Sequence, residues 1–106
     1  MFITYSPQSE TDLEEIADFI ALDNPLRAVS FIREMKESCK KLQEFPLMGV
    51  ARPELEKDSR MLVYKNYRIF YYVTENQVTV DRFLPGSRDL ESAFEDKKQK
   101  FPARSK

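Results

Sequence analysis

The sequence predicts an α+β domain in which an N-terminal strand is followed by an antiparallel helix hairpin packed on a small antiparallel sheet, in the order β-α-α-β-β-β. Three features predict it. Two apolar stripes at helical spacing, each preceded by a capping residue and a proline, fill most of the first half. Three strand-like runs separated by asparagine-containing pairs fill most of the second half, and a short alternating run begins the chain. We expect one domain over residues 1–100, with residues 101–106 as a flexible tail.

The first strand and the two helices carry clear local signals. Residues 2–6 alternate apolar and polar side chains, as a half-buried strand does. Ser6-Pro7 and Asn24-Pro25 each place a capping residue before a proline at the first helical position, where the missing N–H costs nothing. The short connection between the two helices predicts an antiparallel hairpin. The apolar stripes comprise Leu13, Ile16, Ala17 and Ile20 in the first helix, and Ala28, Phe31, Ile32, Met35, Cys39, Leu42 and Phe45 in the second.

The second half of the chain predicts a loop followed by a three-stranded meander. Residues 44–60 contain two prolines and a glycine and are expected to form a long connecting loop, a kind of segment that is often functional. The strands are expected at 61–64, 67–74 and 77–84, joined by tight turns because asparagine tolerates positive φ. The segment 87–101 could add a last helix.

Alternation along the strands assigns side chains to faces. In the strand 67–74, Tyr67, Ile69, Tyr71 and Val73 are expected on one face, and Arg68, Phe70, Tyr72 and Thr74 on the other. In the strand 77–84, the residues expected to share a face are Val78, Val80, Arg82 and Leu84.

The inventory of reactive residues excludes several classes of site. The chain has no histidine, so the usual general acid–base and the commonest metal ligand are both missing. Its one cysteine, Cys39, lies on an apolar helix stripe and is expected to be an inert core thiol. Two glycines cannot form a glycine-rich phosphate loop. We therefore expect no metal and no cofactor. With no apolar run long enough to span a membrane and no basic signal-peptide region, a cytoplasmic protein is expected.

Arginines on or beside the predicted sheet are the candidate binding residues, namely Arg60, Arg68, Arg82 and Arg88. They could converge into a basic patch in which guanidinium groups recognise phosphate and tyrosines stack on bases. Alternatively, the tyrosines fill a half-buried sheet face and each arginine pairs with a nearby acid such as Asp58, Asp81 or Asp89. From composition alone the second interpretation is favoured. The overall charge of −1 is well below that of a dedicated nucleic-acid binder.

Several segments together resemble the RelE/ParE superfamily of type II toxin–antitoxin toxins, and the ParE branch most closely. The resemblance covers about residues 2–90. It rests on the order and spacing of "DLEEIADFIALDNPLRA", "PLMG", "YRIFYYV" and "RFLPGSRD" rather than on any single motif.

The resemblance implies the same element order and a cognate antitoxin, encoded alongside, whose C-terminal segment wraps and neutralises the toxin. RelE-like members cut mRNA on the ribosome with basic residues of the sheet, often with a tyrosine or histidine near the C-terminus. ParE-like members instead poison DNA gyrase and do no chemistry themselves. Here Pro85 stands where many relatives carry histidine, and no tyrosine follows Tyr72, so nothing obvious takes a proton from a 2′-hydroxyl unless Glu54, Glu56 or a tyrosine is recruited.

We therefore expect a gyrase-poisoning binding protein rather than an enzyme, and the expected target-binding residues are Arg60, Arg68, Arg82 and Arg88. The alternative is a ribosome-dependent mRNA endonuclease, with Arg60, Arg68 and Arg82 around the cleaved phosphate. A degenerate toxin that only binds its antitoxin is a third interpretation.

Antitoxin binding is expected in the groove between the helix hairpin and the sheet. The helices carry more apolar residues than one stripe can bury, and an amphipathic segment of the partner could cover the excess as a helix in a groove. The ordinary alternative is a wide core face. The candidate antitoxin-binding residues are Phe19, Leu22, Val29, Phe31 and Phe70.

Overall fold

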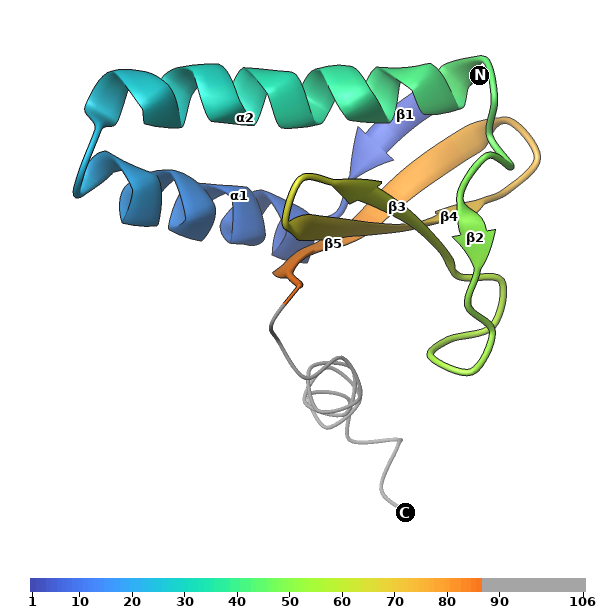
Figure 1. Cartoon of the computed structure of the whole chain (residues 1–106). Helices are drawn as coiled ribbons and strands as arrows, with labels where there is room; N and C mark the ends of the chain where they lie inside the picture. Colours follow the sequence, from blue (N-terminus) through green and yellow to red (C-terminus); the bar gives the residue numbers. More distant parts are fainter. Residues whose placement is uncertain (87–106) are drawn as a thin grey trace.

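The computed structural model describes residues 1–86 and confirms the α+β class (Figure 1). The chain forms, in order, β1 (Phe2–Tyr5), α1 (Pro7–Ala21), α2 (Pro25–Lys40), the 3-10 helix η1 (Lys41–Gln43), β2 (Val50–Ala51), β3 (Arg60–Tyr64), β4 (Tyr67–Val73) and β5 (Gln77–Pro85). The expected last helix and Arg88 lie outside the described residues. None of the helices formed by residues 1–86 is both long and apolar enough to cross a membrane.

The sheet has five strands in the order β1-β5-β4-β3-β2. It is mixed rather than purely antiparallel, because β1 pairs parallel with β5 while the other pairs are antiparallel. The helix hairpin and the strands β2 to β4 lie between β1 and β5 in the chain and provide the long connection that a parallel pair requires. The two-residue strand β2 lies within the segment expected to be only a loop.

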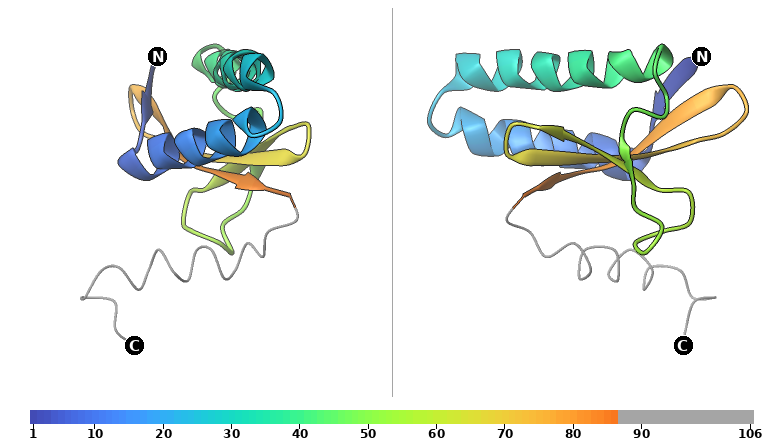
Figure 2. Two further views of the ribbon diagram at one scale, coloured as in Figure 1. Left: turned by 90° about the vertical axis from the view of Figure 1, so that its left-hand side faces the viewer. Right: turned by 45° about the vertical axis from the view of Figure 1, so that its right-hand side comes forward.

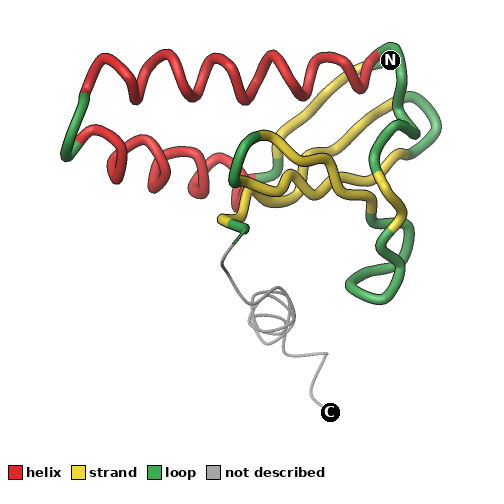
Figure 3. Tube along the Cα trace, viewed as in Figure 1, coloured by secondary structure: helices red, strands yellow, loops and turns green. Residues whose placement is uncertain are grey.

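The two helices begin at the expected caps and lie together on one side of the sheet (Figures 2 and 3). The Ser6 hydroxyl accepts the N–H of Ser9 at 3.0 Å, and the Asn24 side chain accepts the N–H of Arg27 at 3.0 Å. Each cap is followed by proline, so local sequence determines both helix starts.

The main core fills the space between the helices and the sheet, and a smaller cluster lies on the opposite face. The main core consists of Leu13, Ile16, Phe31, Met35, Cys39, Tyr67, Ile69, Val80 and Phe83. The smaller cluster consists of Leu55 from the long loop, Phe70 and Leu84. Cys39 is fully buried, and burial raises the pKa of its thiol to about 12, as expected of an inert core thiol.

A β-bulge in β5 changes the predicted face assignment. Tyr71 is paired with Val80 but Phe70 with Arg82, so Asp81 is the extra residue. Beyond the bulge the alternation is inverted. Val80 packs in the main core, whereas Leu84 packs against Phe70 on the other face. The prediction that Val78, Val80, Arg82 and Leu84 share one face was therefore wrong.

Candidate functional site

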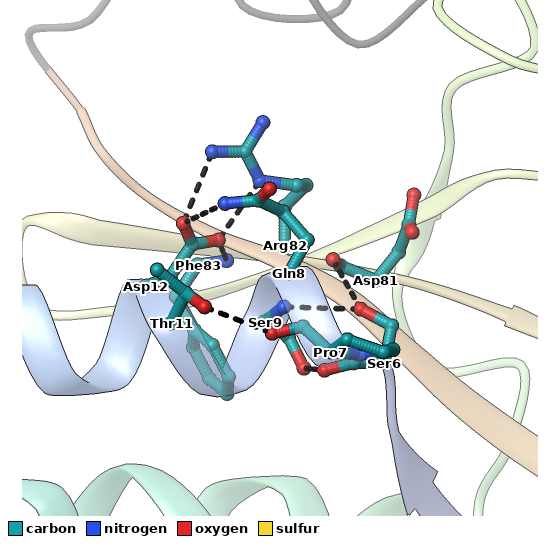
Figure 4. A network of polar contacts seen from close by, with 9 residues as sticks. All are labelled: Ser6, Pro7, Gln8, Ser9, Thr11, Asp12, Asp81, Arg82 and Phe83. Carbon is teal, nitrogen blue, oxygen red and sulfur yellow. Dashed lines mark hydrogen bonds and ion pairs between the residues drawn. The ribbon is translucent and has the colours of Figure 1, made fainter. Parts of the chain in front are cut away.

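Arg82 is held in a buried ion pair with Asp12 of α1 (Figure 4). Its Nε donates to Asp12 Oδ2 at 2.8 Å and its Nη2 to Asp12 Oδ1 at 3.0 Å. The exposed fractions are 4% for Asp12 and 6% for Arg82. Two parallel hydrogen bonds between a guanidinium and a carboxylate form the strongest geometry for such a pair. The Asp12 carboxylate therefore engages two of the five N–H donors of the guanidinium inside the fold.

The edge of β5 explains why Asp12 is placed there. β1 pairs with β5 only as far as Val80, and the Ser6 hydroxyl then donates to the carbonyl of Asp81 at 2.9 Å. Beyond that point α1 replaces β1 beside the strand, and Asp12 Oδ2 accepts the N–H of Phe83 at 2.9 Å. One carboxylate therefore satisfies a strand-edge amide and a buried arginine together.

Arg60 and Tyr71 fasten the loop that leads into β2. The Tyr71 hydroxyl accepts the N–H of Gly49 at 2.9 Å and donates to the carbonyl of Pro46 at 2.8 Å. Arg60 Nη1 donates to the carbonyls of Leu47 at 3.1 Å and Gly49 at 2.7 Å. A Cβ on Gly49 would lie 2.7 Å from the Tyr71 hydroxyl oxygen, so the close approach requires glycine.

Of the three candidate arginines within residues 1–86, Arg68 is the one whose guanidinium has no partner among these residues. It stands in register with Leu84 of β5 and Val63 of β3, on the face turned away from the helices. It makes no hydrogen bond or ion pair with another of residues 1–86. Arg82, opposite Phe70, shares that face but turns its guanidinium to Asp12 at the edge of β5, whereas Arg60 stands opposite Tyr71 on the helix side of the sheet. The structure therefore does not gather these three arginines at one point.

The five predicted antitoxin-binding residues divide into two groups. Phe31 is buried in the main core and Phe70 in the smaller cluster, so both follow the alternative of a wide core face and are not accessible to a partner. Phe19, Leu22 and Val29 remain 70%, 87% and 60% exposed at the helix hairpin. Leu26, which the stripe analysis missed, is also exposed. The sequence did indicate this exposure, because Leu26 follows Pro25 and lies off the apolar stripe of α2.

A network of charged and aromatic side chains connects α2 to the end of β3. Arg27 donates to both carboxylate oxygens of Glu34, at 2.7 and 3.2 Å, and the Tyr64 hydroxyl donates to the same carboxylate. The hydrogen bond from Arg27 is the main cause that lowers the pKa of Glu34 to about 2. The Glu34 carboxylate therefore stays charged in moderately acidic solution as well, and its hydrogen bonds link α2 to β3.

A pocket of about 390 Å³ lies between α1 and the end of the sheet where β4 begins and β5 ends. Its lining includes Glu15, Ile16, Phe19, Tyr67, Phe83 and Pro85. Among residues 1–86, no group of three or more histidine, cysteine, aspartate or glutamate side chains is placed to hold a metal ion.

Comparison with known proteins identifies the family. Residues 3–90 match the family model described as the ParE toxin of type II toxin–antitoxin system, parDE. The chain belongs to the ParE toxin family. Its fold is similar to that of a solved chain from the chromosomal ParDE TA system of P. aeruginosa, with a TM-score of 0.70 and 22% identity over 80% of this chain and 95% of that chain. No curated protein matches the sequence.

Membership in the ParE family confirms the resemblance on which the functional expectations rest. The matched residues extend from β1 to the end of β5, and so include both helices and the loop that Arg60 and Tyr71 hold. At 22% identity, the structural likeness shows the shared fold alone.

Proposed function

We propose that this ParE-family chain is a toxin that arrests growth by poisoning DNA gyrase and is neutralised by a cognate antitoxin. The observation that carries the proposal is the burial of Arg82 against Asp12. A nuclease would need that guanidinium at the scissile phosphate. Here it is occupied by a carboxylate, and Arg60 is engaged with backbone carbonyls.

The second argument against a nuclease is that no histidine or suitably placed tyrosine is available to accept a proton. The chain has no histidine. The described tyrosine nearest to Arg82 in register is Tyr71, whose hydroxyl donates to the Pro46 carbonyl and accepts the Gly49 N–H. Burial raises the pKa of the Tyr71 hydroxyl, which keeps it protonated at neutral pH and unable to take up another group's proton. Together with family membership, these contacts support a toxin that acts by binding.

For target binding we propose Arg68 as the main described contact. Arg60 and Arg82 then act by holding the loop and α1 in place, so their contribution to the target would be indirect. Arg88 lies outside the described residues and stays a prediction. For antitoxin binding we propose the exposed residues Phe19, Leu22 and Val29 at the helix hairpin.

The proposal is tested with purified toxin in two parallel reactions. One contains gyrase and supercoiled plasmid, and the other contains translating ribosomes on a defined mRNA. We expect linearised plasmid after detergent and protease treatment, with the mRNA intact. Arg68→Ala is expected to reduce the linear product strongly, whereas Arg33→Ala, an exposed arginine on α2, is expected to leave it unchanged. Phased cuts in the mRNA with untouched plasmid would contradict the proposal and favour the endonuclease.

A further inference from the structure

The pocket between α1 and the end of the sheet combines apolar walls with an acidic rim. Ile16, Phe19 and Phe83 provide much of the apolar wall, and Glu15 and Asn66 bring a carboxylate and an amide. Phe19 remains 70% exposed although it lines the pocket. A large aromatic side chain left in water beside a cavity is a feature of binding surfaces.

The charge that the described residues bring to this pocket is negative and unbalanced. Of the two acids in its lining, Asp12 is neutralised by Arg82, whereas Glu15 makes no ion pair with a described residue. Among residues 1–86, no lysine or arginine lines the pocket. The nearest lysine in sequence to the lining, Lys65, places its ammonium over the Tyr64 ring, 5.4 Å from the centroid.

The rest of α1 strengthens this negative field. The helix has no basic residue in its last turn, and Arg27 is the first basic residue of the chain. The acids that precede it are Glu10, Asp12, Glu14, Glu15, Asp18 and Asp23. A partner that approaches this face is therefore selected for positive charge.

A side chain with an apolar stem and a cationic end is complementary to both the apolar wall and the acidic rim of the pocket. A long apolar stem can cover the exposed ring of Phe19 while its cationic head reaches the Glu15 carboxylate. Arginine fits better than lysine, because its planar guanidinium stacks on aromatic faces and can hydrogen-bond a carboxylate through two nitrogens.

We propose that this pocket receives an arginine side chain from a helical segment of the antitoxin, with its stem over Phe19 and its guanidinium on Glu15. The assignment rests on the proposed function, since it takes the antitoxin as the partner. It makes Glu15 a determinant of antitoxin affinity through charge, in addition to the apolar residues Phe19, Leu22 and Val29.

The first test measures the affinity of full-length cognate antitoxin for three full-length toxins by calorimetry. They are the wild type, Glu15→Lys, and the matched control Glu14→Lys, which places the same charge at the neighbouring exposed position outside the pocket. We expect Glu15→Lys to raise Kd by at least about 30-fold and Glu14→Lys by less than about threefold. With Glu15→Lys, reversal of one antitoxin arginine to glutamate is expected to restore binding. Equal losses in both variants, or no rescuing arginine, would overturn the assignment.

The second test needs no antitoxin and so separates the pocket from the proposed function. Amide NMR spectra of the full chain are recorded during titration with arginine amide and, as a control, norleucine amide. We expect arginine amide alone to shift the signals of Glu15 and Phe19, and Glu15→Gln to abolish these shifts. No shifts, or a pocket already covered by a second copy of the chain, would overturn the assignment even if the antitoxin binds. Shifts without antitoxin binding would instead count against the proposed function.

Discussion

Asp12→Ala is expected to lower the free energy of unfolding by about 3–5 kcal/mol, because it leaves the Arg82 guanidinium buried without its counter-charge. The same carboxylate also accepts the N–H of Phe83 and the side-chain amide of Gln8, so the substitution removes the acceptor of four donors at once. The cost of such unpaired buried groups is large compared with the total stability of a small domain. Urea unfolding followed by far-UV circular dichroism measures the change.

Glu15→Ala is the matched control, since it removes an exposed carboxylate three residues along the same helix. We expect it to change the free energy of unfolding by no more than about 0.5 kcal/mol. If Asp12→Ala were as mild as this control, the buried pair would not be the main connection between α1 and β5.

Tyr71→Phe is expected to lower the free energy of unfolding by about 1–3 kcal/mol, because it leaves the Gly49 N–H and the Pro46 carbonyl without their partner. The phenyl ring keeps its place in the core, so the loss is confined to the two hydrogen bonds. Amide hydrogen exchange at Gly49 is expected to accelerate, which locates the effect in the loop.

Tyr72→Phe provides the comparison on the next residue of the same strand. Tyr72 stands opposite Thr79 on the other face and is partly exposed, so its hydroxyl is not expected to hold the loop. Its effect on unfolding should stay within about 0.5 kcal/mol. Equal effects from the two substitutions, or unchanged exchange at Gly49, would show that Tyr71 does not hold the loop.

The parts of the fold that depend on local signals could be predicted from the sequence. Ser6 and Asn24 cap their helices as expected, because a cap bonds to an N–H three residues away. The parallel pairing of β1 with β5 was missed because it joins distant segments. The bulge at Asp81 was also missed, since it depends on how β5 is paired with β4 and carries no glycine signal.

In the candidate site, too, residue types could be predicted from the sequence, whereas contacts between distant residues could not. The arginines were recognised as important from residue type, but the partner of Arg82 lies 70 residues away in sequence and was not among the acids considered. Asp12 did carry a signal, since it precedes Leu13 and lies one turn before Ile16, beside the apolar stripe. Exposure at the hairpin could not be read from the stripe alone, because packing buries Phe31 and leaves Phe19 in water.

The central claim is that Arg82 stabilises the fold through its ion pair with Asp12 and does not bind the target of the toxin. The most direct test is growth arrest by the double variant Asp12→Asn with Arg82→Met, expressed at the same folded level as the wild type. Removing both charges of a buried pair is far less costly than removing one, so the double variant is expected to fold. We predict that it arrests growth as the wild type does. A folded double variant that no longer arrests growth would contradict the account and place the Arg82 guanidinium at the target.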